Sequence, residues 1–216
     1  MTNELTMSLG MLMALGAFHG INPGMGWLFA VALGMQERSR GAVLRAILPL
    51  GAGHALAVAG AVGVALALGS MLPLDQLRWL TGGVLIALGV LRVFRHSHPR
   101  AAGMRVGMGG LTVWSFLMAT AHGAGLMVVP VFLGMSMAAS GEHMHHMHMH
   151  GGGGTSVGAA LVATALHAAS YLAVTAAIAV LVFDRLGVGI LRRVWLNVDL
   201  VWAAALVVTG GVTLLM

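Results

Sequence analysis

Four histidines lie inside long apolar stretches of the sequence, where ionisable side chains are rare. They are His19, His54, His122 and His167. Ionisable residues in such stretches are costly and usually face a partner or a cavity, and neutral imidazole is a common ligand for zinc, copper, iron and nickel. Each histidine could instead bond a neighbouring helix as part of the packing. Because there are four of them and they recur in pairs, we favour a shared metal-binding site.

The sequence around the first of these histidines predicts an interrupted helix. Residues 19–26 read His-Gly-Ile-Asn-Pro-Gly-Met-Gly, and proline removes a backbone donor and clashes with the preceding helical turn. Carbonyl groups freed by such a break are tolerated at membrane depth where they are buried in protein or line a wet cavity. We therefore expect His19, Asn22 and Met25 to form a cation site at the break; the alternative is a simple proline kink.

A second group of candidate ligands is a run of eight consecutive His and Met residues that is followed by four glycines. Histidine-rich tracts are typical of metal binding. Interleaved thioethers favour Cu(I), while imidazole alone also suits nickel, cobalt or zinc. An internal expression tag is the alternative, although tags are rarely interleaved with methionine. We predict an external metal-capture loop that contains His143, Met144, His145, His146, Met147, His148, Met149 and His150.

The composition of the chain is that of a membrane protein. Of 216 residues, 59% are hydrophobic and 8% are charged, whereas soluble domains carry about 25% charged residues. The absence of cysteine excludes disulfides and thiolate ligands. There is no phosphate-binding loop, nucleophile elbow or zinc-protease motif, so we predict a protein that is not an enzyme and has no prosthetic group. The net charge of +5 does not indicate nucleic-acid binding, because the arginines lie in short loops between apolar runs.

A membrane-spanning helix needs about 20 mostly apolar residues, and six stretches of the sequence are candidates. The first is interrupted at Asn22, Pro23 and Gly24, and the fourth carries Pro130. Both are longer than one span requires, which predicts tilted or broken helices. The six stretches are residues 7–36, 43–68, 77–94, 111–139, 157–183 and 194–216.

The arginines fall on one side of this predicted topology. Ten of the eleven lie in or near the loops that follow the first, third and fifth stretches, and only Arg78 lies on the other side. Basic residues are enriched in the cytoplasmic loops of membrane proteins. We therefore predict a multi-pass protein of the cell inner membrane with both termini outside and with the loop at residues 140–156 in the periplasm.

The two halves of the chain resemble each other. Phe-His-Gly at residues 18–20 parallels Ala-His-Gly at 121–123, and Gly-His-Ala at 53–55 parallels Leu-His-Ala at 166–168. With three helices in each half, the second half is inverted relative to the first. We predict an all-α integral membrane fold with six transmembrane helices in two inverted three-helix repeats, a plan common in secondary transporters, whose binding site lies where the repeats meet. The predicted repeats are residues 1–110 and 111–216.

Three motifs in the first part of the chain carry a family resemblance. They are Phe-His-Gly-Ile-Asn-Pro-Gly-Met-Gly at residues 18–26, Arg-Ser-Arg-Gly at 38–41 and Gly-His-Ala at 53–55. This region, about a fifth of the chain, resembles the NicO-type nickel/cobalt transporters of the lysine exporter superfamily. The resemblance implies six helices in two inverted halves, transport of a divalent cation, and His19 and His54 as ligands. Where that family has a second histidine after Pro-Gly, this chain has Met25, and a thioether in place of imidazole favours copper over nickel and cobalt.

Together these features predict a transporter whose substrate is a transition-metal cation, either nickel/cobalt or copper. We expect one repeat to rock against the other, and we expect the lipid bilayer, the metal ion and a periplasmic metal carrier as partners. Two alternatives remain open: an accessory membrane protein that binds metal without transporting it, and a membrane redox protein whose histidines ligate haem or a metal. The predicted intramembrane ligands are His19, Asn22, Met25, His54, His122 and His167.

Overall fold

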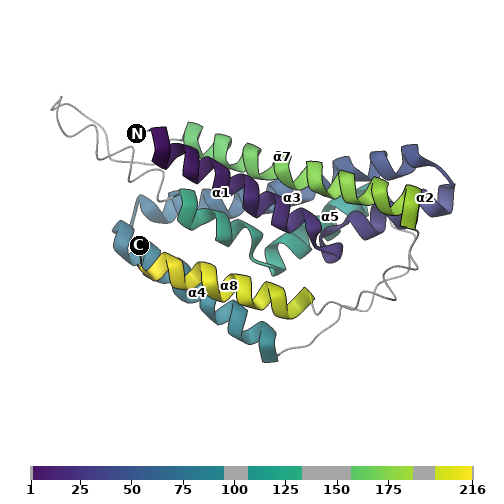
Figure 1. Cartoon of the computed structure of the whole chain (residues 1–216). Helices are drawn as coiled ribbons and strands as arrows, with labels where there is room; N and C mark the ends of the chain where they lie inside the picture. Colours follow the sequence, from purple (N-terminus) through teal and green to yellow (C-terminus); the bar gives the residue numbers. More distant parts are fainter. Residues whose placement is uncertain (1, 95–106, 133–156, 187–197, 216) are drawn as a thin grey trace.

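The computed structural model describes residues 2–94, 107–132, 157–186 and 198–215, and the regular structure of these segments is entirely helical (Figure 1). Helices occupy all six stretches that the sequence predicts to be helical, which confirms the all-α class for the described part of the chain. The elements are α1 (Thr2–Ile21), the 3-10 turn η1 (Pro23–Met25), α2 (Trp27–Glu37), α3 (Arg40–Gly69), α4 (Leu74–Phe94), α5 (Met108–Ala121), the helix Ala124–Phe132, α7 (Val157–Leu181), the π-helical turn η3 (Val182–Leu186) and α8 (Val198–Leu215).

Several of these helices have the length and composition of membrane spans. Within the described residues, three qualify singly, namely Arg40–Gly69, Asp75–Phe94 and Ala160–Arg185, and a bent pair in the fourth stretch makes a fourth if it counts as one span. The described parts of the first and sixth stretches, Thr6–Ile21 and Leu200–Leu215, are shorter apolar helices. Large apolar side chains such as Leu48, 73% exposed, cover the outer surface. The total of six spans and their inverted arrangement stay predictions.

The first stretch is broken where the sequence places Asn22 and Pro23. The Asn22 side chain caps the turn that follows by accepting a hydrogen bond from the Gly24 amide at 2.9 Å. Gly26 then adopts a φ of 131°, a conformation that glycine reaches without strain, and an added Cβ there would press on Leu50. The predicted interruption is therefore confirmed, and residues 22–26 are called the first break below.

The fourth stretch is also broken, and its break contains its histidine. α5 ends at Ala121, and Ala124–Phe132 continues at an angle of 60°. Gly123 occupies the turn with a φ of 70°, in the left-handed region that favours glycine. Pro130 lies inside the second segment, so the bend is set by residues 122–123, called the second break below, and not by the proline.

The described helices pack in pairs that join the two halves of the chain. α1 lies along α7, α3 along α5 and α4 along α8, and α3 also contacts α7 (Figure 1). Glycines allow the close approach: a Cβ at Gly16 would overlap the His167 carbonyl oxygen, and one at Gly53 would overlap the Thr112 carbonyl oxygen. Small residues permit such backbone contact between membrane helices. The two halves are therefore interlocked, and exchanging them leaves this set of pairs unchanged.

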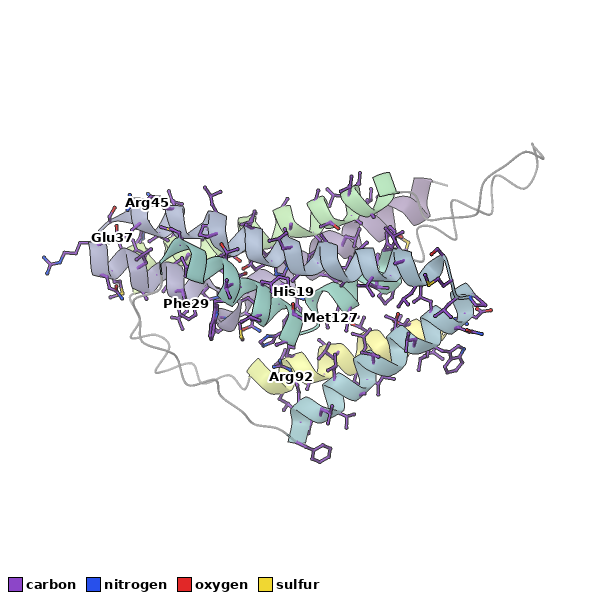
Figure 2. The ribbon with its side chains drawn as sticks, turned by 180° about the vertical axis from the view of Figure 1, so that it is seen from behind. His19, Phe29, Glu37, Arg45, Arg92 and Met127 are labelled. Atoms are coloured by element: carbon purple, nitrogen blue, oxygen red, sulfur yellow. The ribbon has the colours of Figure 1, made fainter. Side chains whose placement is uncertain are left out.

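One end of the molecule carries four of the described arginines, namely Arg38, Arg40, Arg45 and Arg185. Arg45 Nη2 donates to Glu37 Oε2 at 2.6 Å across the turn between α2 and α3 (Figure 2). Arg40 pairs with Asp184 at 3.6 Å, which brings the end of α7 to the same place. α1 begins and α8 ends toward the opposite end (Figure 1). These arginines share one side, as predicted, whereas Arg92, predicted for the same side, lies apart from Arg45 and donates to the Ala121 carbonyl oxygen at 2.6 Å (Figure 2). The direction relative to a membrane stays a prediction.

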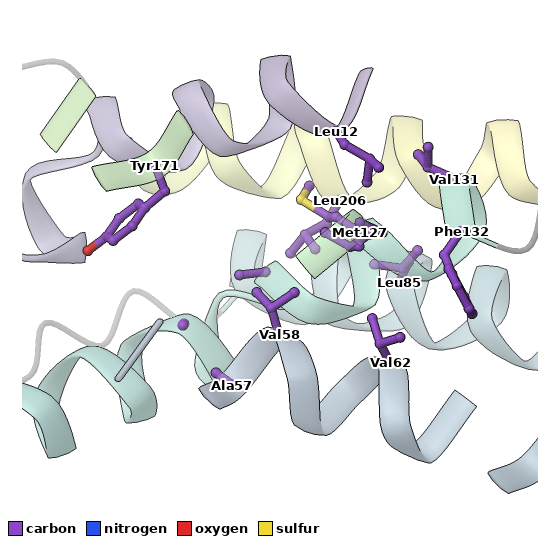
Figure 3. Close-up of a cluster of buried hydrophobic side chains, with 14 of the residues drawn as sticks. Leu12, Ala57, Val58, Val62, Leu85, Met127, Val131, Phe132, Tyr171 and Leu206 are labelled. Atoms are coloured by element: carbon purple, nitrogen blue, oxygen red, sulfur yellow. The ribbon is translucent and has the colours of Figure 1, made fainter. Parts of the chain in front are cut away.

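An apolar core connects these helix pairs. It includes Leu12 from α1, Val58 from α3, Met127 from the helix Ala124–Phe132 and Leu206 from α8 (Figure 3). Tyr171 from α7 lies at the edge of this cluster in Figure 3, and its hydroxyl points away from the apolar side chains. The core thus holds the helix pairs together. The buried polar residues of the interior lie beyond its edge.

Candidate functional site

Three of the four predicted histidines meet in the interior of the molecule. His19 from α1, which lies near the middle of the bundle in Figure 2, His54 from α3 and His167 from α7 are all fully buried. The ring centroids are 5.0 Å apart for His19 and His167, 5.5 Å for His19 and His54, and 5.3 Å for His54 and His167. These residues, far apart in sequence, form one polar group, called the three-histidine cluster below.

Backbone carbonyls fix the position of the hydrogen on two of these rings. His19 Nδ1 lies 2.5 Å from the Leu15 oxygen, and His167 Nδ1 lies 3.2 Å from the Leu12 oxygen. A carbonyl oxygen only accepts, so each Nδ1 carries the hydrogen, and in the neutral ring each Nε2 presents its lone pair. Carbonyl partners of this kind orient metal-binding imidazoles in proteins. Both rings are therefore held in the tautomer that a ligand at Nε2 requires.

The Nε2 atoms of His54 and His167 face each other at 3.2 Å. Two nitrogens bound to one tetrahedral ion with metal–nitrogen bonds of 2.0–2.1 Å lie about 3.3 Å apart. The same separation also suits a hydrogen bond that His54 Nε2 donates to the lone pair on His167 Nε2. A pair of axial haem ligands, in contrast, would stand on opposite sides of the iron, about 4 Å apart at similar bond lengths. The pair therefore fits two ligands of one tetrahedral ion better than it fits haem.

Two ring nitrogens of the cluster are buried without a hydrogen-bond partner, namely His19 Nε2 and His54 Nδ1. Such atoms are few in native proteins, and each one needs a physical explanation. A cation held at His19 Nε2 would provide one. Among the described residues, however, no group of three or more His, Asp or Glu side chains is arranged to hold a metal ion. A three-ligand site therefore requires His19 to move toward the pair formed by His54 and His167.

The fourth histidine, His122, lies at the second break and meets the cluster through a tryptophan. Its Nδ1 is 2.8 Å from the Met118 oxygen, which repeats the pattern of His19 and the carbonyl four residues before it. The Trp202 ring from α8 contacts both histidines, with centroids 4.8 Å from His19 and 5.4 Å from His122. The structure thus brings three predicted ligands into mutual contact and places the fourth beside the same tryptophan.

Asn22 and Met25 are both buried in the first break. The Oδ1 atom of Asn22 accepts from the Gly24 amide, and its Nδ2 has no partner. The Met25 side chain belongs to the apolar core, and its carbonyl oxygen accepts a hydrogen bond from the Tyr171 hydroxyl at 2.6 Å. In this arrangement Asn22 is a turn cap and Met25 is a core residue, and a ligand role for either stays a prediction.

The predicted metal-capture loop at residues 140–156 lies outside the described residues, so metal contact by its His and Met residues stays a prediction. The acidic side chains that the structure describes lie elsewhere: Glu37, Asp75 and Asp184 each pair with an arginine near the end of a helix. A cation in the three-histidine cluster would therefore be held by neutral donors. Because a buried charge without a counter-charge is costly, neutral donors suit a site that must release its ion.

Sequence reasoning missed two residues beside the cluster, Tyr171 and Trp202. The Tyr171 ring stacks on His54 with centroids 3.9 Å apart and 11° between the planes. A signal for Tyr171 was present, because it follows His167 by four residues and helical periodicity places both on one face of α7. Trp202 has no comparable signal, since its position depends on how α8 packs beside α4.

Comparisons of the chain with protein-family models, with curated protein sequences and with solved structures find no match.

Proposed function

We propose that this chain is a multi-pass membrane transporter of transition-metal cations and that the three-histidine cluster is its binding site. The observation that carries the proposal is the meeting of His19, His54 and His167 from three helices, with two Nε2 atoms 3.2 Å apart. Separate packing roles would leave the buried His19 Nε2 unexplained, because it bonds to no other helix. A cation that binds between the rings accounts for both features.

The donor chemistry supports a borderline or soft transition metal. Imidazole suits zinc, copper, iron and nickel, whereas magnesium and calcium prefer oxygen ligands. Nickel, cobalt and copper all remain candidate substrates of the proposed site. The resemblance to NicO-type transporters favours nickel or cobalt, and Met25, if its thioether reached the ion, would favour copper.

The proposed architecture is six spans in two inverted halves, in the inner membrane with both termini outside. Two features support the inverted halves: each half begins with a helix that is broken at or soon after a His-Gly pair, and exchanging the halves leaves the helix pairs unchanged. The arginines at the end formed by α2, α3 and α7 support the sidedness.

The interlocked packing changes which parts are expected to move. The pairs α1–α7, α3–α5 and α4–α8 each contain one helix from each half, so rocking one half against the other would separate all three at once. Several glycine contacts in these pairs are with backbone atoms, such as those of Gly16 and Gly53, and tolerate little sliding. We propose that the moving bodies are drawn from both halves and that the two breaks supply the flexibility, as broken helices do in other transporters.

Flux into proteoliposomes tests the proposed function. Ni²⁺, Co²⁺, Zn²⁺ and Cu⁺ are offered separately to the full chain, to the His54→Ala variant and to a Thr213→Ala control. The control removes a buried hydroxyl that bonds Thr209 within α8, away from the cluster. We expect one metal to enter with the full chain and the control and to be excluded by His54→Ala.

Three other results would change the assignment. Unaltered flux in His54→Ala would remove the cluster from the transport path. Metal binding without flux of any metal would favour the accessory protein, and a haem absorption spectrum would favour the redox protein.

A further inference from the structure

Tyr171 connects the three-histidine cluster to the first break. Its ring stacks on His54 with centroids 3.9 Å apart, and its hydroxyl donates to the Met25 carbonyl oxygen at 2.6 Å. Met25 ends the 3-10 turn inside that break. One buried side chain therefore packs against a cluster ring with its face and holds a carbonyl of the break with its polar end.

Trp202 makes the corresponding connection to the second break. Its ring lies 4.8 Å from the His19 ring, with 82° between the planes, and its Nε1 donates to the His122 carbonyl oxygen at 2.7 Å. Phe18 stacks on the same indole with centroids 4.7 Å apart and 5° between the planes. The indole is thus held in place by packing while its N–H holds a carbonyl at the bend.

We propose that Tyr171 and Trp202 are positioning residues that couple the three-histidine cluster to the two helix breaks. The proposal rests on the proposed function, because it says how an ion at the cluster would change the backbone. The link itself needs no ion. A movement of one cluster ring displaces the aromatic side chain packed against it, and that side chain bonds one specific carbonyl.

The physical basis is that an ion changes an equilibrium only through contacts that differ between two states. The cluster has to tighten around an ion, because its rings are not arranged as a three-ligand set among the described residues. Movement of His54 or His19 displaces the aromatic ring packed against it. A displaced Tyr171 or Trp202 no longer satisfies its buried carbonyl, which then needs another partner, and the break changes conformation.

Thiol labelling tests the link without metal. The chain contains no cysteine, so Gly24→Cys reports on the first break and Ala121→Cys on the second. At position 24 a Cβ would lie 3.3 Å from Asn22 Oδ1 and 3.6 Å from the end of Met118, so the Asn22 side chain has to shift by a few tenths of an ångström, and each variant is compared with Gly24→Cys alone. Maleimide reacts with the water-exposed thiolate, so a loosened break labels faster.

The expected pattern is specific to each break. Tyr171→Phe keeps the ring and removes the hydroxyl. We expect it to speed labelling at position 24 about fivefold, the factor that corresponds to the loss of one net hydrogen bond. Labelling at position 121 should not change. Trp202→Phe should do the reverse. His54→Ala should speed labelling at position 24, although His54 itself donates no bond to the break.

The matched control removes another hydroxyl of α7, the helix that carries Tyr171. This hydroxyl bonds to no residue of either break. Ser170 donates to the Met13 carbonyl oxygen at 2.7 Å, in the continuous part of α1. Ser170→Ala should leave labelling at both positions unchanged. Equal rates in all variants, or faster labelling at both positions in every variant, would overturn the proposal.

Measurements of metal affinity and turnover then distinguish coupling of the cluster to the breaks from binding of the ion. Co²⁺ is used as the probe, because its visible absorption reports on its ligands. In Tyr171→Phe and Trp202→Phe we expect Co²⁺ affinity within about twofold of the full chain and turnover lower by about fivefold. A loss of affinity that equals the loss of turnover would mean that the two residues only build the site, and the proposal would fail.

The labelling and the metal measurements distinguish failure of this proposal from failure of the proposed function. If the full chain binds Co²⁺ and carries neither it nor any other metal, the proposed function fails, and the labelling pattern still decides whether the cluster is linked to the breaks. If transport occurs and the labelling pattern is absent, the proposed function stands and the link is overturned.

Discussion

Replacement of Gly53 by alanine tests whether the helix packing described here builds the site. Gly53 lies on α3, directly before His54, and faces α5. An added Cβ would overlap the Thr112 carbonyl oxygen and come within 2.9 Å of both the Phe116 amide nitrogen and the Ser115 Cβ. Two of these three atoms are backbone, so a change of side-chain rotamer relieves little of the overlap. The two helices have to separate, and His54 has to move with α3.

The size of the effect follows from the cost of overpacking. Extra methyl groups in well-packed interiors cost about 1–3 kcal/mol, and contact with a fixed backbone atom places Gly53→Ala at the upper end. For a chain of this size, each kcal/mol lowers the midpoint of thermal unfolding by about 2–4 °C. We expect the midpoint in detergent to fall by about 5–10 °C, and metal flux to fall as well, because the ring of His54 is displaced.

Gly60→Ala is the matched comparison. Gly60 lies on the same helix, and an added Cβ there would meet nothing within 4 Å. Alanine is favoured over glycine in a helix by about 1 kcal/mol, so this variant should unfold at the same temperature as the full chain or above it. The packing argument would be refuted if Gly53→Ala were as stable as Gly60→Ala and retained full flux, since α3 and α5 would then not approach as closely as described.

Two further predictions concern ligands that the sequence suggested. Met25→His should shift substrate preference from copper toward nickel or cobalt in competition flux assays; because the Met25 side chain is buried in the apolar core, an unchanged preference together with lower stability would show that it does not reach the ion. Deletion of residues 142–150 should weaken metal capture at low concentration while the thermal midpoint stays the same, and a lower midpoint would instead give that loop a structural role.

The helices and the first break could be anticipated from local sequence, whereas the fourth stretch was expected only to be tilted or broken. Apolar runs of spanning length fixed where the helices lie, and Asn22 with Pro23 marked the first break. The second break was harder to locate, because Pro130 was the residue that suggested a break in the fourth stretch. The chain turns instead at Gly123, which has a positive φ. Local signals of this kind work because helix formation and helix interruption depend on neighbouring residues.

The composition of the site was harder to predict, because it depends on packing between distant helices. The histidines were identifiable as ionisable residues in apolar runs, and the structure brings His19, His54 and His167 together. The sequence did not show that Trp202 would stand beside both His19 and His122, or that Met25 would turn its side chain into the core. Such contacts depend on how α1 packs against α7 and on how α8 packs against the other helices. Local periodicity in the sequence does not encode this packing.

The position of each break beside a histidine has a mechanical consequence. His19 and His122 are each held by the carbonyl four residues earlier, in the last turn before the helix is interrupted. In a continuous helix, a rotation of that turn would have to move the whole helix against glycine contacts that allow little sliding. A break lets the last turn rotate while the remainder stays packed, so the ring that would bind an ion moves at low cost. The first helix of each half can thus combine a candidate ligand with a hinge, while α3 and α7 carry His54 and His167 as continuous helices, in which we expect the side chains to shift and the backbone to stay in place.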